Sequence, residues 1–66
     1  MKFKMEWSGV SEQNGHIEIR SGYRSVIADD EEEAKNIALH FLYNFINWDA
    51  ILEDANGRLI ASLDSE

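Results

Sequence analysis

Two Asn-Gly pairs, each lying between runs of alternating apolar and polar residues, constrain the fold of this chain most strongly. Asn14-Gly15 separates the runs KFKMEW and HIEIR, and Asn56-Gly57 separates WDAILE and RLIASL. Asn-Gly favours the positive φ angles of a tight hairpin turn, and alternation with a period of two is typical of a half-buried strand. The sequence therefore predicts one β-hairpin near each end of the chain.

The alternation also predicts which residues of the first hairpin face the core. Val10 falls on the opposite parity from the preceding apolar residues, so we expect a β-bulge at Ser8-Gly9 that restores the alternation. A second irregularity is expected at Gly22. The residues expected to face inward are Phe3, Met5, Trp7, Ile17 and Ile19.

The other positions of this hairpin are expected to form an open sheet face of mixed charge. They are Lys2, Lys4, Glu6, His16, Glu18, Arg20 and Arg24. A basic sheet face with aromatic rings can bind single-stranded nucleic acid, but here acidic residues dilute it.

Between the hairpins the sequence predicts one amphipathic helix. Asp29 or Asp30 suits the N-cap, and Glu32 or Glu33, three residues on, would complete a capping-box-like pair. The stripe expected to lie on the sheet is Ala34, Ile37, Ala38, Phe41 and Phe45. The fold expected is a single α+β domain over residues 1–66, a β-hairpin–α-helix–β-hairpin (ββαββ) with a four-stranded antiparallel sheet and one helix on one face. The strand order stays open.

The apolar arc of this helix spans about 240°, which is more than one sheet can cover. Beyond the stripe it includes Leu39, Leu42, Tyr43 and Ile46. An exposed apolar patch usually marks an interface, so these four residues are candidate partner-binding residues. The alternatives are that the C-terminal strands cover them as core, or that they join two copies in a homodimer.

The net charge of −7 is unevenly distributed along the 66 residues. The chain carries a net charge of +1 through Ala28. From Asp29 onward it has ten acidic residues and only two basic ones, Lys35 and Arg58. Direct nucleic-acid binding is disfavoured, because it needs basic clusters. The acidic residues are expected to meet a basic surface on a larger protein: Asp29, Asp30, Glu31, Glu32, Glu33, Glu53, Asp54 and Asp64. Solubility alone would also explain the acidity.

No motif points to catalysis, a metal or a cofactor. The chain has no cysteine, and His16 and His40 have no spacing typical of ligands or of a catalytic pair. We therefore expect a protein that is not an enzyme and binds no cofactor. The start of the chain does not have the pattern of a secretory signal, and no apolar run is long enough to span a membrane, so a cytoplasmic protein is expected.

In size and charge the chain resembles the small accessory proteins of phages and mobile elements, including inhibitors of bacterial defence systems. The resemblance involves no motif and transfers no residue role. It implies a non-enzymatic inhibitor that occludes a basic or nucleic-acid-binding surface of a host protein, as a DNA mimic would. The alternative is a homo-oligomeric structural or regulatory module whose acidity is only solubilising.

Overall fold

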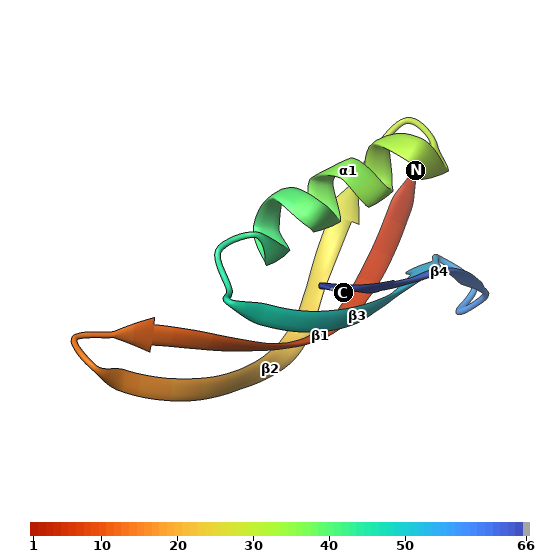
Figure 1. Ribbon diagram of the computed structural model, residues 1–66. Helices are drawn as coiled ribbons and strands as arrows, with labels where there is room; N and C mark the ends of the chain where they lie inside the picture. Colours follow the sequence, from red (N-terminus) through yellow and green to blue (C-terminus); the bar gives the residue numbers. More distant parts are fainter. Residues whose placement is uncertain (66) are drawn as a thin grey trace.

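A computed structural model describes residues 1–65 and shows two hairpins joined by one helix (Figure 1). The elements are β1 (Lys2–Gln13), β2 (His16–Ile27), α1 (Glu31–Leu42), β3 (Asn47–Asp54) and β4 (Leu59–Asp64). The four strands form one antiparallel sheet in the order β2-β1-β3-β4, and α1 packs on one of its faces. The predicted α+β fold is confirmed, and the order that the sequence left open places β2 and β4 at the edges.

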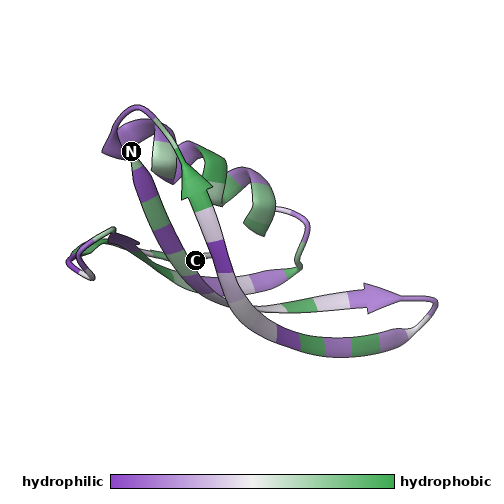
Figure 2. Ribbon diagram, turned by 180° about the vertical axis from the view of Figure 1, so that it is seen from behind, coloured by the Kyte–Doolittle hydropathy of each residue, from purple (hydrophilic) through white to green (hydrophobic). Residues whose placement is uncertain are grey.

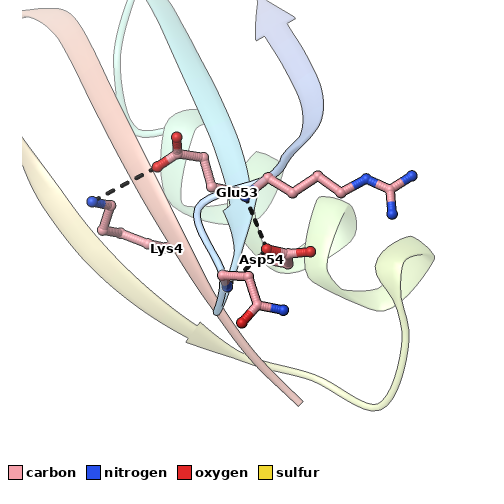
Figure 3. A network of polar contacts seen from close by, with 5 residues as sticks. Lys4, Glu53 and Asp54 are labelled. Carbon is pink, nitrogen blue, oxygen red and sulfur yellow. Dashed lines mark hydrogen bonds and ion pairs between the residues drawn. The ribbon is translucent and has the colours of Figure 1, made fainter.

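Both predicted turns are present. Asn14 and Gly15 adopt φ angles of 54° and 83°, as a two-residue turn between β1 and β2 requires. The second turn is longer, and Gly57 supplies its positive φ of 82°. There the Asp54 carboxylate accepts hydrogen bonds from the backbone N–H groups of Asn56 and Arg58, each at 2.9 Å (Figure 3).

The β-bulge predicted at Ser8-Gly9 is wrong, and so is the irregularity predicted at Gly22. Over their described length β1 and β2 pair without interruption, and β1 pairs with β3 without interruption as well. With no extra residue in the strand, Val10 and its cross-strand partner Ile19 stay on the face opposite to Phe3, Met5 and Trp7. Ile17 lies on the same face as Ile19, so both isoleucines point away from the helix, contrary to expectation. Their neighbours His16, Glu18, Arg20 and Arg24 therefore lie on the helix side of the sheet.

The core lies between α1 and the covered face of the sheet. Its buried residues are Phe3, Met5, Val26, Ala28, Ala34, Ala38, Leu42, Trp48, Ala50 and Leu52. The predicted helix stripe is partly wrong, because Ile37 is 37% exposed whereas Leu42 is fully buried. The helix is rotated so that Ala34, Ala38 and Leu42 meet the sheet, and the two alanines allow a close approach.

The helix ends at Leu42, before the last apolar residues of the predicted arc. The N–H of Phe45 donates to the carbonyl of Leu42 at 3.0 Å, in place of a continuing α-helical bond, and the Asn44 side chain donates to the carbonyl of Phe41 at 2.9 Å. Residues after Leu42 therefore do not belong to the helix. The predicted apolar arc, which continues through Ile46, is too wide for the helix that forms.

Phe45 instead packs onto the sheet over Gly9. A β-carbon at Gly9 would lie only 2.7 Å from Cγ of Phe45, so the ring occupies the space that a side chain would take. Trp7, Phe41 and Phe45 form a cluster with ring centroids 5.0–5.7 Å apart. The Arg24 guanidinium lies over the Phe41 ring, 4.6 Å from its centroid. The packing of the Phe45 ring over Gly9 thus fixes the loop after α1 to the middle of the sheet.

The molecule is elongated, with extents of 39 × 19 × 17 Å. β3 pairs with β1 only as far as Val10, so the strand residues from 11 to 18 pair only with each other within the described chain. These residues form the ribbon, a two-stranded projection that extends past both α1 and β3 (Figure 1).

Candidate interaction surface

Most acidic residues at the start of α1 have local partners. Asp30 is the N-cap, and its carboxylate accepts a hydrogen bond from the N–H of Glu33 at 2.8 Å. The Glu33 carboxylate in turn accepts from the N–H of Asp29, the residue before the N-cap, at 2.8 Å, so Asp30 and Glu33 form the predicted capping-box-like pair. Glu32 forms an ion pair with Lys35 at 3.5 Å. Capping and pairing therefore account for much of this acidic run.

The acidic residues of β3 and β4 also have neighbours and do not form one surface. Glu53 pairs with Lys4 at 3.7 Å, and Asp54 holds the second turn (Figure 3). Asp54 is the cross-strand neighbour of Phe3, at the end of the sheet where α1 begins, whereas Asp64 lies opposite Asp49 farther along the sheet. The structure thus separates Asp64 from the other predicted acidic residues.

Asp30→Ala is expected to lower the free energy of unfolding by about 0.5–2 kcal/mol, because it removes the carboxylate that caps the N–H of Glu33. Urea denaturation followed by circular dichroism measures the change. Glu31→Gln is the matched control, because it removes one charge from the same turn and leaves the hydrogen bonds of Asp30 and Glu33 in place, and it should cost less than about 1 kcal/mol. Equal losses in the two variants would mean that charge, and not capping, explains the acidic run.

The predicted apolar surface of the helix is only partly exposed. Leu42 is fully buried and belongs to the core, so its assignment to a partner surface is corrected. Leu39 is half-buried and packs against the core. Tyr43 and Ile46 are exposed in the loop after α1, where the Tyr43 ring meets Trp48 edge-on at 6.1 Å. Only a small part of the predicted surface is therefore available to a partner.

A larger apolar surface lies on the sheet face opposite to α1, here called the open face. Four β2 side chains on it are strongly exposed: Ile17 (69%), Ile19 (79%), Tyr23 (69%) and Ile27 (75%). The register places all four on the same face of β2. Figure 2 shows green and purple bands alternating along the part of β2 next to the first turn. No element within residues 1–65 covers them.

The sequence predicts an open sheet face of mixed charge and misses its apolar side chains, because of the bulge expected at Ser8-Gly9. One signal could have revealed them. A two-residue turn at Asn14-Gly15 places Gln13 opposite His16, and this pairing puts Ile17 and Ile19 on the face opposite to Phe3.

The middle of the open face is concave and more polar than its β2 margin. A depression of about 440 Å³ lies there, and its lining includes Glu6, Ser21, Tyr23, Asp49 and Ile51. The Lys4 ammonium lies 5.1 Å from the centroid of the Tyr23 ring. The depression is open and shallow, and its mixed lining resembles a contact surface more than an enclosed ligand site.

The histidines do not form a reactive cluster in the structure. His16 lies at the tip of the ribbon and His40 on the exposed side of α1. Within residues 1–65 no group of three or more His, Asp or Glu side chains is placed to hold a metal ion. Across the same residues, no helix is long and apolar enough to cross a membrane.

Comparison with protein-family models, with curated proteins and with solved structures finds no match to this chain.

Proposed function

We propose that this protein is a non-enzymatic protein-binding module that docks through its open face. The observation that carries the proposal is the row of exposed apolar side chains on β2, from Ile17 to Ile27. Exposed apolar side chains gathered on one face of a small domain usually mark an interface. Complete burial of one such side chain contributes about 1.5–3 kcal/mol, so a partner that covers several of them gains substantial affinity.

The ribbon supports the same proposal. An isolated two-stranded hairpin is at best marginally stable in water, and residues 11–18 pair with no third strand of the described chain. A partner lying against the open face of the ribbon would supply the missing packing. Since Ile17 and Ile19 are the apolar side chains of β2 in this part of the molecule, they are the expected centre of the contact.

The proposal differs from the charge-based expectation in the surface that binds. The acidic residues Asp30, Glu33, Glu53 and Asp54 have structural partners, which favours a local and solubilising role for them. On the open face, β1 and β2 present Lys2 and Lys4 together with Glu6 and Glu12, so these two strands add no net charge there. A basic partner surface is therefore not required for docking there.

The double variant Ile17→Lys/Ile27→Glu tests the proposal, because it charges the open face without touching the core. Wild type and variant are immobilised in equal amounts, exposed to extract of the source cells and to soluble copies of the chain itself, and compared for retained protein. Retention is expected on wild type and is expected to fall at least about tenfold on the variant, because it charges Ile17 at the centre of the expected contact and Ile27 at the other end of the apolar row, and charging an apolar contact often costs about 2 kcal/mol or more.

Ile46→Lys is the matched control, because it charges an exposed isoleucine on the helix side of the molecule. It should retain as much protein as wild type, and circular dichroism should give the same melting curve for all three proteins. Equal retention by the double variant and wild type would refute docking through the open face. Loss in Ile46→Lys alone would place the interface at the loop after α1 instead.

A further inference from the structure

The outer edge of β2 carries unpaired backbone groups beside the exposed side chains. Met1 and Ala28 exchange both backbone hydrogen bonds, at 2.7 and 3.0 Å, which marks them as a hydrogen-bonded pair. In an antiparallel ladder such pairs alternate with pairs whose N–H and C=O groups point away from the partner strand. Continuing the register along β2, the residues whose N–H and C=O groups point outward are Ile17, Ile19, Ser21, Tyr23, Ser25 and Ile27.

The two edges of the sheet differ in how they are protected. β4 is six residues long, and the register shifts between Leu52 and Glu53 along its pairing with β3. Short edge strands and bulges are common means of preventing edge-to-edge association. β2 is twelve residues long, contains no proline and pairs with β1 in one unbroken register. It is therefore the edge that can add another strand.

We propose that β2 pairs antiparallel with β2 of a second copy of this chain, about a two-fold axis at Ser21, so that the two sheets become one. This inference rests on the proposed function, because the contact that it adds is made by open-face side chains of β2 in the two copies. In this register Ser21 lies opposite its own copy, and Ile19 lies opposite Tyr23 of the second copy. The symmetry repeats that pair on the other side of the axis, which gives four apolar side chains in contact along one face.

Charge complementarity selects this register. With the axis at Ser21, Glu18 lies opposite Arg24 of the second copy, and the symmetry forms this pair twice. Opposite charges directly across antiparallel strands are favourable and like charges are unfavourable. An axis one residue later, at Gly22, places Arg20 opposite Arg24. An axis at Ile19 pairs Glu18 with Arg20 but places Tyr23 opposite the turn residue Gly15.

The Arg24 side chain is already held in place for such a contact. Its guanidinium lies over the Phe41 ring of its own chain at 4.6 Å, while the residue as a whole is exposed. The interaction with the ring limits the rotamers of a long side chain, so less conformational entropy is lost when Glu18 of the second copy approaches. Phe41 thus links the helix of one copy to the charge pair of the interface.

The position of the helices and the distribution of charge also permit this arrangement. The buried residues Val26 and Ala28 lie at the end of β2 that α1 covers, and the ribbon end is uncovered. An antiparallel pair about Ser21 brings the ribbon of each copy beside the helix-covered end of the other, so the two helices lie far apart. Two chains of charge −7 repel each other in most orientations, but this edge belongs to the segment of net charge +1.

Ser21→Pro is the sharpest test, because it removes one outward N–H at the proposed axis. Proline is tolerated on an edge strand where the N–H faces solvent, so the β1–β2 ladder should remain. Sedimentation velocity over a concentration series is expected to show a dimer for wild type and a monomer for Ser21→Pro. Ser21→Ala is the matched control, because it keeps the N–H and removes only the hydroxyl, and it should remain a dimer.

A charge reversal tests the register and does not depend on the fold of the proline variant. Glu18→Arg and Arg24→Glu alone should each raise the dimer dissociation constant at least about tenfold, because like charges then face each other twice across the interface. The double variant Glu18→Arg/Arg24→Glu restores opposite charges and should recover most of the affinity. Thermal melting of each monomer by circular dichroism separates loss of pairing from loss of folding.

Each result supports or overturns the proposal. A wild type that is monomeric at all concentrations up to about 1 mM overturns it, and so does a dimer that persists in a folded Ser21→Pro variant. A dimer weakened by both single reversals and not recovered in the double variant excludes the register about Ser21. If Ile17→Lys/Ile27→Glu abolishes protein retention while Ser21→Pro does not alter self-association, the open face binds a different partner. The proposed function then stands and this inference fails.

Discussion

Leu42→Ala is expected to destabilise the protein by about 2–5 kcal/mol, the range for removing a fully buried leucine side chain and leaving a cavity. Leu42 is fully buried where α1 meets the sheet, and the core around it includes Ala34, Ala38 and Leu52. A domain of this length has a free energy of unfolding of about 3–10 kcal/mol. The variant should therefore be largely unfolded or melt far below wild type, as measured by urea denaturation and by thermal circular dichroism.

Ile46→Ala is the control for this prediction, because Ile46 is exposed in the loop only four residues later. Exposed substitutions of this kind usually change stability by about 0.5 kcal/mol or less. A loss in Ile46→Ala equal to that in Leu42→Ala would mean that the loop packs on the core. The helix would then extend through Ile46, as the sequence alone predicts.

Gly9→Ala is expected to destabilise the protein by about 1–3 kcal/mol, the usual cost of overpacking a close-packed site. The new methyl group would lie 2.7 Å from Cγ of Phe45, and that ring is held by contacts with Trp7 and Phe41. Chemical denaturation measures the loss. The double variant Gly9→Ala/Phe45→Leu should lose less than the sum of the two single variants, because the smaller side chain leaves room for the methyl group.

Gly22→Ala is the matched control, because Gly22 lies on the same face of the sheet in the neighbouring strand. A methyl group there would meet Trp7 at 3.7 Å, an ordinary contact distance. It should leave stability unchanged or raise it by about 0.4–1 kcal/mol, since alanine reduces the entropy of the unfolded chain. If Gly9→Ala proves as mild as Gly22→Ala, Phe45 moves freely and does not fix the loop to the sheet.

The elements with strong local signals could be predicted from the sequence. Asn14-Gly15 and Gly57 occupy positive φ angles in both turns, and Asp30 with Glu33 forms the expected capping-box-like pair. These features depend on backbone conformation and on hydrogen bonds within a few residues, and such information lies within a short stretch of sequence. The α+β order of hairpin, helix and hairpin follows from them.

The orientation of the apolar faces depended on single residues and was less predictable. The sequence predicts a bulge at Gly9, but the role of this glycine is to leave space for Phe45, a residue 36 positions away. One inserted residue reverses every later side chain of a strand, so this error placed Ile17 and Ile19 in the core. The predicted helix interface is wrong for a similar reason. The sequence predicts that the helix continues through Ile46, but α1 ends at Leu42.

The ribbon has a further consequence for local unfolding. Its backbone hydrogen bonds between residues 11 and 18 receive no support from a third strand or from buried side chains of the described chain. Amides of such segments exchange through local opening at a free energy well below that of global unfolding. In the monomer, at concentrations too low for β2 to pair with a second copy, the ribbon amides should therefore exchange with deuterium sooner than those near Met5 and Leu52, and a protease should cut first near Asn14-Gly15. The four-stranded body would keep its protection after such a cut.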